Sequence, residues 1–488
     1  MNTVEQFVGR VLTVRGQIVT VRCESDYRPA LRELLSAEAN SRVLIEVHSY
    51  KERDLLYCLL LSDKSELKRN MHIVSRGRSL SIPVGQSVLG RAINIYGNPV
   101  DGGPPLSFEE TRLIDAPGQK RLRQDAAERR FLDTGIKALD FFTPLLDGGN
   151  LALVGGAGVG KTVLMTEIIR NLNSSHPGVT LYTGIGERIR EGHELWLSLK
   201  EAKVLEKTAL IVAHINENAA VRLKVASAAA TLAEYFRDEK AQDVLFFADN
   251  VFRFVQAGNE LSTLLEEIPS EYGYQSTLES DMARFQSRLG PGERTTITSV
   301  QTVYVPADEL SDPSLAAALP YFEAVVILSR EMSQEGRFPA IDLLNSKSSI
   351  SSRASTDETD IAHVRALTAA VEILQQYQRI ARIVSIIGEG ELTPQDKVIY
   401  QRATRLRNYM TQPFFTQQTH TGRGGVFVKR SEAIQDVDAI LRGDYDDIQP
   451  EHFMYIGRAA EVRELGPQAP NASAEVPAAI PVPVPPAL

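Results

Sequence analysis

One glycine-rich segment restricts what this chain can fold into more than any other feature. Residues 155–162 read Gly-Gly-Ala-Gly-Val-Gly-Lys-Thr and fit the pattern G-x-x-x-x-G-K-[ST]. An apolar run, Leu151–Val154, precedes the segment, and residues with apolar side chains on one helix face follow it. Strand, glycine loop and helix in this order are the setting of a phosphate-binding loop, so the sequence predicts one here.

Each part of this loop suits the binding of nucleotide phosphates. Glycines let successive N–H groups turn into one hollow, and the N-terminus of the following helix adds partial positive charge. Lys161 would reach the β- and γ-phosphates, and the Thr162 hydroxyl would ligate Mg²⁺. A merely flexible turn would leave the Lys-Thr pair unexplained. The predicted nucleotide-binding residues are Gly155, Gly156, Ala157, Gly158, Val159, Gly160, Lys161, Thr162 and Val163.

Short apolar runs alternate with helical segments around the loop. Such runs are typical of strands in a parallel sheet that is covered on both faces. The runs are Leu151–Val154, Val179–Tyr182, Leu210–Ala213, Val244–Ala248, Ile297–Val300 and Ala324–Leu328. Helical segments such as Val221–Arg237 separate several of them. We therefore expect a central α/β nucleotide-binding domain with a mostly parallel sheet over residues 97–356.

The flanking regions have other patterns, so the predicted fold class is multidomain α+β. Residues 1–96 contain short runs of alternating apolar and polar residues, which predict an N-terminal β-barrel. Residues 357–465 carry apolar residues at helical spacing, which predicts a C-terminal helical domain. Residues 466–488 are rich in proline and are expected to form a disordered tail.

Composition excludes several classes of protein. A formal net charge of −9 and the lack of a clustered basic stripe argue against a nucleic acid partner. Two cysteines are too few for a disulfide scaffold or a cysteine-rich metal site. Apolar runs are shorter than the roughly 18 to 20 residues that span a bilayer, and the first ten residues do not read as a secretion signal. We expect a cytosolic protein, or one held at a membrane only by partners.

Two charged segments are predicted to lie at the same edge of the sheet. The run Val244–Ala248 ends in Asp249, and parallel sheets bind ligands at the carboxyl ends of their strands, so Asp249 would lie near the Mg²⁺. Taken alone, an Asp after a strand is more often a helix or turn cap. The segment Gly186–Gly192 follows another strand, and taken alone its charges fit a solvated turn equally well.

With these motifs in place, the sequence resembles the catalytic β subunit of the F-type rotary ATP synthase from about Gly9 to Gly457. The motifs that carry the resemblance are Gly155-Gly-Ala-Gly-Val-Gly-Lys-Thr-Val163, Gly186-Glu-Arg-Ile-Arg-Glu-Gly192, Ala233-Glu-Tyr-Phe-Arg-Asp238, Asp249-Asn-Val-Phe-Arg-Phe254, Gly273-Tyr-Gln275, Thr298-Ser-Val-Gln301, Tyr304-Val-Pro-Ala-Asp308 and Gln412-Pro-Phe414. The family's domain order of barrel, nucleotide domain and helices agrees with the order predicted above.

The resemblance implies roles for individual residues. Glu187 would be the catalytic carboxylate that orients and polarises the water attacking the γ-phosphate. Arg188 and Arg288 would hold that phosphate. Phe338 and Phe414 would form the adenine pocket, a task that suits flat apolar rings, although core packing would explain any single Phe.

The resemblance also implies a cofactor and partners. The cofactor would be Mg²⁺ with ATP or ADP, bound by Thr162 and, through water, by Asp249 and Glu191. An α subunit would supply an arginine finger in an alternating α3β3 ring around a central γ rotor, with the membrane sector contacted indirectly. The location would be the cytoplasmic face of a bacterial plasma membrane. At the position that holds the finger in α, this chain has Ser349, or Arg353 if the alignment shifts.

The chain departs from the family pattern in places. Residues 216–222 lack two prolines and a glycine, residues 390–396 keep only two carboxylates of an acidic rotor-contacting segment, and His420 replaces an adenine-contacting Phe. None of these changes removes a group needed for the chemical step. We therefore expect a working but divergent enzyme that makes ATP from ADP and phosphate, coupled to a proton or sodium gradient, and that hydrolyses MgATP in reverse.

Three alternatives remain at this point. A homohexameric ATPase of flagellar or type III protein export shares the loop and the three-domain plan. A nucleotide-binding ring subunit without turnover is disfavoured because the carboxylate of Glu187 is present. An RNA-translocating hexamer is disfavoured by the acidic charge balance.

Overall fold

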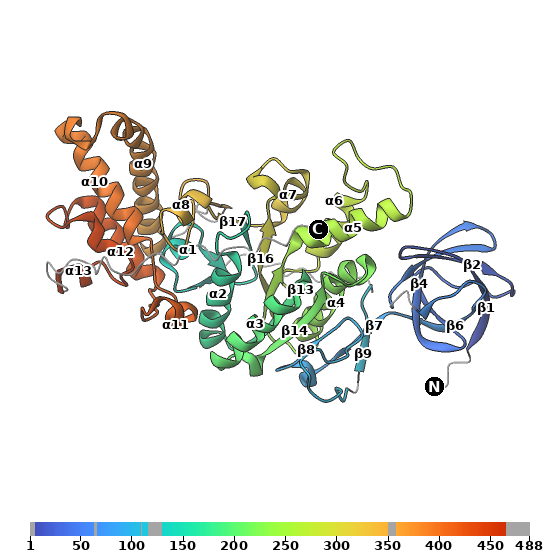
Figure 1. The fold of residues 1–488 in the computed structure, drawn as a ribbon. Helices are drawn as coiled ribbons and strands as arrows, with labels where there is room; N and C mark the ends of the chain where they lie inside the picture. The colour runs from blue at the N-terminus through green and yellow to red at the C-terminus, as the bar shows by residue number, and fades with distance from the viewer. Residues whose placement is uncertain (1–4, 63–65, 109, 116–128, 350–357, 465–488) are drawn as a thin grey trace, which may run out of the picture. The chain divides into compact units, whose positions relative to one another are not determined.

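The computed structural model describes residues 5–62, 66–108, 110–115, 129–349 and 358–464 (Figure 1). The chain forms two compact units. The first comprises residues 1–132, 145–157 and 161–325, and the second comprises residues 133–144, 158–160 and 326–488. The predicted tail, 466–488, and Arg353 lie outside the described residues.

The first unit begins with a closed antiparallel barrel, which confirms the prediction from alternating residues (Figure 1). The strand order is β1-β2-β5-β4-β3-β6. The strands are β1 (Gln6–Arg15), β2 (Ile18–Cys23), β3 (Glu33–Ala37), β4 (Asn40–Glu52), β5 (Leu55–Leu60) and β6 (His72–Ser79). Their inward-facing side chains, such as Val19, Leu35 and Ile45, are fully buried and form one apolar core.

The barrel is complete at Ser79, before the predicted boundary at residue 96. The next strands pair elsewhere: β7 (Ser81–Val84) pairs with β9 (Glu110–Leu113), and β8 (Ala92–Ile93) joins the central sheet. Alternation of apolar residues marks a strand but does not show which sheet it joins, so the sequence could not separate these strands from the barrel.

The central sheet of the first unit contains each apolar run that was predicted to be a strand. Its order from β17 is β17-β12-β16-β15-β13-β14-β8. The strands are β12 (Asn150–Gly155), β13 (Val179–Glu187), β14 (Thr208–His214), β15 (Val244–Asp249), β16 (Ile297–Tyr304) and β17 (Ala324–Ile327). All neighbouring pairs from β12 to β8 are parallel, so the carboxyl ends of β12, β13 and β15 lie at one edge.

Helices cover this sheet, as expected for an α/β domain (Figure 1). The helices are α2 (Lys161–Ser175), α3 (Ile189–Glu201), α4 (Ala219–Asp238), α5 (Val251–Leu264), α6 (Leu278–Gln286) and α7 (Pro313–Ala318). Buried alanines, Ala226 and Ala228–Ala230 among them, allow α4 to pack closely on β13 and β14. Shorter elements are β10 (Phe131–Leu132), β11 (Leu145–Leu146), η2 (Gln86–Val88), η3 (Leu205–Lys207), η4 (Pro306–Asp308) and η5 (Leu319–Tyr321).

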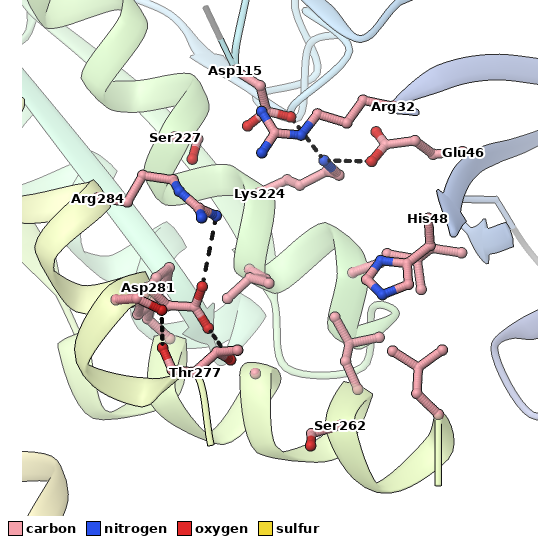
Figure 2. A pocket seen from close by; sticks show the side chains of 18 of the residues that line it. Arg32, Glu46, His48, Asp115, Lys224, Ser227, Ser262, Thr277, Asp281 and Arg284 are labelled. Carbon is pink, nitrogen blue, oxygen red and sulfur yellow. Dashed lines mark hydrogen bonds and ion pairs between the residues drawn. The ribbon is translucent and has the colours of Figure 1, made fainter. Parts of the chain in front are cut away.

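A buried cluster of charges joins the barrel to α4 (Figure 2). Lys224 Nζ lies 2.8 Å from Glu46 Oε1 and 3.2 Å from Asp115 Oδ2. Burial opposes the charge on Lys224, but the two carboxylates outweigh it, so the pKa of Lys224 is raised. Burial also raises the pKa of Glu46. The cluster borders a cavity of about 380 Å³ that Arg32 and His48 help to line.

Replacing Lys224 by Met should lower the free energy of unfolding by about 3 kcal/mol at pH 7, because Glu46 would be left buried without its cation. Urea unfolding of the full chain, followed by circular dichroism, measures the change. Arg15→Met is the matched control, since the 3.2 Å Arg15–Glu266 ion pair also links the barrel to the rest of the first unit but is exposed. The control should lose about 1 kcal/mol at most. Equal losses in both variants would contradict the importance of the buried cluster.

The second unit is helical, which confirms the prediction for the C-terminal region (Figure 1). Its elements are α1 (Lys137–Phe142), α8 (Arg330–Gln334), β18 (Lys347–Ser348), α9 (Glu358–Ile387), η7 (Glu389–Glu391), α10 (Pro394–Tyr409), η8 (Phe415–Gln417), α11 (Gln418–Thr421), α12 (Arg430–Arg442), η9 (Pro450–Phe453) and α13 (Glu461–Glu464). Helices α9, α10 and α12 pack against one another. Among the described residues, none of the helices combines the length and apolar character needed to cross a membrane.

Helix α1 comes early in the sequence but lies in the core of the second unit, where all its residues are buried. Lys137 Nζ donates to the carbonyl oxygen of Ile456 at 2.7 Å and lies 4.1 Å from the centre of the Tyr409 ring. Full burial lowers the pKa of Lys137 to about 7. His363 Nε2 lies 2.7 Å from the carbonyl oxygen of Phe141. These contacts fix α1 to segments that lie more than 220 residues later in the sequence.

Candidate functional site

The glycine-rich loop joins β12 to α2 at the carboxyl edge of the sheet. Gly158 and Gly160 have φ angles of +76° and +91°, which favour glycine and let the backbone curl before α2 begins at Lys161. Lys161 Nζ donates to the carbonyl oxygen of Gly155 at 2.8 Å and lies 5.5 Å from the centre of the Tyr304 ring. The ammonium group of Lys161 is thus held at the loop itself.

Asp249 ends β15 beside the start of α2. Thr162 Oγ1 donates to Asp249 Oδ2 at 3.3 Å, and Thr302 Oγ1 donates to Asp249 Oδ1. Asp249 is almost fully buried, and this burial raises its pKa although Thr302, Lys161 and Thr162 act against the shift. The structure therefore brings together Lys161, Thr162 and Asp249, which the sequence predicted to share one site.

Glu187 ends β13 and reaches the same edge through a β-bulge. The register between β13 and β14 shifts between Ile185 and Glu187, so Gly186 is the extra residue. Gly186 has a φ of +66°, which glycine adopts without steric cost. The register with β15 places Gly184 opposite Asp249. The bulge and this pairing bring Glu187 close enough to Asp249 for the two carboxylates to interact.

Negative charge accumulates around Glu187. The side chain is largely buried, and Tyr182 donates its hydroxyl hydrogen to Glu187 Oε2 at 3.2 Å. Burial, then the charge of Asp249 and a hydrogen bond with Glu191, raise the pKa of Glu187 to about 10. Glu191, in the first turn of α3, also lies 3.5 Å from the exposed Arg188. A cation bound beside these carboxylates would relieve their mutual repulsion.

The available donors fit Mg²⁺. Thr162, Asp249 and Glu191 offer only oxygen atoms, which hard cations such as Mg²⁺ prefer. Among the described residues, no group of three or more His, Cys, Asp or Glu side chains could hold a metal ion. Mg²⁺ commonly keeps several waters and takes one or two protein ligands together with substrate phosphates. The sparse donor set therefore suits an ion that arrives with a nucleotide.

Arg288 does not lie with these residues, in contrast to what the resemblance implied. Its Nε and Nη2 donate to the carboxylate of Glu234 at 3.0 and 2.6 Å, and its remaining donors bind Thr231 and backbone carbonyl oxygens. Thr231 and Glu234 lie in the second half of α4, which begins after the carboxyl end of β14 and leads back to the amino end of β15. Arg288 therefore lies away from the loop and stabilises α4.

Arg253 is an arginine that the structure brings to this edge, as it does Arg222, and the sequence predicted no role for Arg253. It lies in the first turn of α5, four residues after Asp249. A methyl group added at Gly186 would come within 3.2 Å of Arg253 Cβ, so Arg253 is in contact with the bulge next to Glu187. Its Nη1 donates to Gln256 at 2.8 Å. The signal was present in the sequence, because Arg253 follows the strand-ending Asp249 within one helical turn.

The two predicted adenine-contacting rings lie in the second unit. Gln412 donates its backbone N–H to the carbonyl oxygen of Phe338 at 2.9 Å, so the segments that carry Phe338 and Phe414 run side by side. The Gln412 side chain also donates to Gly135 and Val426. Phe414 is buried, whereas Phe338 is 40% exposed. Phe338 thus offers an open aromatic face.

The parallel sheet, the glycine loop and the carboxylates at the strand ends define a P-loop nucleotide-binding domain. Residues 135–348 match the family model of the nucleotide-binding domain of the ATP synthase alpha/beta family. Residues 353–423 match the model of the C-terminal domain of V and A type ATP synthase. The chain therefore carries the nucleotide-binding domain of the ATP synthase alpha/beta family, and its C-terminal match is to the V and A types rather than to the F type named by the resemblance.

Replacing Glu187 by Gln should stabilise the nucleotide-free protein at pH 8. Folding raises the pKa of the Glu187 carboxyl group from 4.5 to about 10. As the pH rises between these two values, the folded protein loses stability, because only the folded state keeps the proton. The thermal midpoint of Glu187→Gln should therefore exceed that of the unchanged protein at pH 8 and approach it near pH 4.5. Calorimetry in EDTA tests this, with Glu194→Gln on the exposed side of α3 as control. A lower midpoint for Glu187→Gln at pH 8 would disprove the expectation.

Proposed function

We propose that this chain is the catalytic subunit of a rotary ATP synthase. It makes ATP from ADP and phosphate when an ion gradient drives the rotor, and it hydrolyses MgATP in reverse. One observation carries the proposal: the carboxylate of Glu187 lies beside Asp249 at the edge where the phosphate-binding loop opens. The family match to the ATP synthase alpha/beta nucleotide-binding domain supports it.

Phosphoryl transfer requires mainly positioning and charge compensation from the protein. Lys161 supplies a positive charge at the loop, and the backbone N–H groups of the loop add further donors. Thr162 would hold Mg²⁺ directly, with Asp249 and Glu191 acting through water. The metal ion would supply charge neutralisation between the phosphates. Glu187 would bind the attacking water and would orient and polarise it as the bond to phosphorus forms.

Arg253 is proposed here to hold the terminal phosphate, together with Arg188. Arg253 lies in the first turn of α5 against Gly186, the neighbour of Glu187, whereas the guanidinium group of Arg288 is occupied by Glu234 and its neighbours. Arg188 precedes α3, and its side chain is 71% exposed with one long contact to Glu191, which leaves it able to turn toward a ligand. Guanidinium groups suit this role because their paired N–H donors match phosphate oxygens.

Phe338 and Phe414 would bind the adenine ring. An α chain would provide the arginine finger, since this chain has Ser349 at the corresponding position and Arg353 lies outside the described residues. A γ rotor and, through it, the membrane sector would couple the ring to a proton or sodium gradient at the cytoplasmic face of the membrane.

A V-type or A-type rotary enzyme is the second candidate, and the match of residues 353–423 favours it. Purification of the native complex through a tag on this chain, followed by mass spectrometry, distinguishes the candidates. A second nucleotide-binding chain of the F-type α kind would support the F-type assignment, and V-type or A-type partner chains would replace it. A ring made of this chain alone would instead support an export ATPase.

Two variants of the purified complex test the catalytic proposal. Glu187→Gln should lower kcat for MgATP hydrolysis by about 100-fold or more while nucleotide still binds, because only the positioning of the water is lost. Lys161→Ala should weaken MgATP binding itself. A phosphate-release assay and equilibrium binding of labelled MgATP measure the two effects. Glu194→Gln is the control on the same helix, and unchanged hydrolysis in both site variants would refute the proposal.

A matched pair of arginine variants tests the assignment of Arg253. Arg253→Gln should lower kcat/KM for MgATP by about 100-fold, a loss typical of removing one charged donor to a transition state. Arg288→Gln should lower the thermal midpoint, because it breaks the buried pair with Glu234, and should leave the kcat of the folded enzyme close to normal. The opposite result, with kcat lost only in Arg288→Gln, would return the role to Arg288.

A further inference from the structure

Tyr182 is a polar side chain in a strand whose surroundings are apolar. Its ring is 1% exposed and lies in β13, where Leu210 of β14 and Phe247 of β15 are its direct neighbours. Both neighbours are fully or almost fully buried. A phenol at this depth needs a partner for its hydroxyl group. That partner is Glu187, whose Oε2 accepts the hydroxyl hydrogen at 3.2 Å.

The bulge at Gly186 makes this contact. Tyr182 and Glu187 are five positions apart, and in a regular strand an odd separation places two side chains on opposite faces. The extra residue of the bulge returns Glu187 to the face of Tyr182. A methyl group added at Gly184 would lie 3.5 Å from both the Tyr182 ring and Glu187 Cβ. The two side chains therefore meet above Gly184.

Two other groups, Asp249 and Glu191, also act on the Glu187 carboxyl group. Asp249 repels it, and Glu191 shares a hydrogen bond with it. A carboxylate under such opposing influences can rotate about its last bond, because that torsion has no deep minimum. Tyr182 stays neutral, since burial and the nearby carboxylates raise its pKa, and it can donate only one hydrogen. By donating that hydrogen to Oε2, Tyr182 fixes the plane of the carboxylate.

We propose that Tyr182 is a positioning residue for phosphoryl transfer: its hydroxyl group holds the Glu187 carboxylate in the orientation that binds the attacking water, and the Gly186 bulge makes the contact possible. This inference rests on the proposed function, because it assigns Tyr182 to the reaction in which Glu187 acts. With Oε2 held by Tyr182, Oε1 is the oxygen that would face the attacking water. Because the hydroxyl group of Tyr182 donates its hydrogen to Glu187, Tyr182 acts on the chemical step and not on nucleotide binding.

Tyr182→Phe in the purified complex tests the inference, because it removes only the hydroxyl oxygen and keeps the ring. We expect kcat for MgATP hydrolysis to fall about tenfold, while KM and the affinity for labelled MgADP change less than about twofold. In the Glu187→Gln background, the same change should alter the residual rate by less than about twofold, since the group that Tyr182 positions is already lost.

Tyr409→Phe is a matched control. Tyr409 is also fully buried, and its hydroxyl group donates to the carboxylate of Asp436 at 2.8 Å in the second unit. This variant should lower the thermal midpoint without changing kcat. If Tyr182→Phe behaved like Tyr409→Phe, with a lower midpoint and an unchanged kcat, the positioning role would be overturned. A fully active Glu187→Gln enzyme would overturn the proposed function itself, whereas an inactive Glu187→Gln with a fully active Tyr182→Phe would overturn only the role of Tyr182.

Discussion

The parallel pairing of β13 with β15 is the constraint on which the candidate site depends. It sets Gly184 opposite Asp249, and this register brings the ends of both strands to the edge where the phosphate-binding loop leaves β12. A slip of one residue in either strand would turn its terminal carboxylate to the other face of the sheet. The fully buried apolar side chains along both strands oppose such a slip, because it would disturb the packing on each face.

Two buried carboxyl groups meet at this edge of the sheet. Asp249 and Glu187 are both buried, both have raised pKa values, and both depend on hydroxyl groups for their orientation, from Thr162 and Thr302 in one case and from Tyr182 in the other. Lys161 is the nearby cation that the loop provides. Such a site is complementary to a ligand that brings its own divalent cation, so the electrostatics and the family match support the same chemistry.

Sequence patterns predicted the parts of the fold that depend on long, regular features. The apolar runs became the central sheet, and the glycine loop lies between β12 and α2 as expected. The placement of arginines was harder to predict, because a motif does not show at which end of a helix a side chain will lie; Arg288 and Arg253 are the examples. The contact of Tyr182 with Glu187 depends on one inserted residue, and no periodicity in the sequence reveals a bulge.

The position of α1 has a consequence for how the chain can be divided. Its residues belong to the second unit, yet the sequence that follows it, from β12 to β16, returns to the sheet of the first unit. A gene fragment that began at residue 326 would encode α9, α10 and α12 without Lys137 beneath Tyr409 and without the carbonyl oxygen that meets His363. The second unit is therefore discontinuous in sequence. Neither unit could have been gained or lost in one piece by fusion at a single junction.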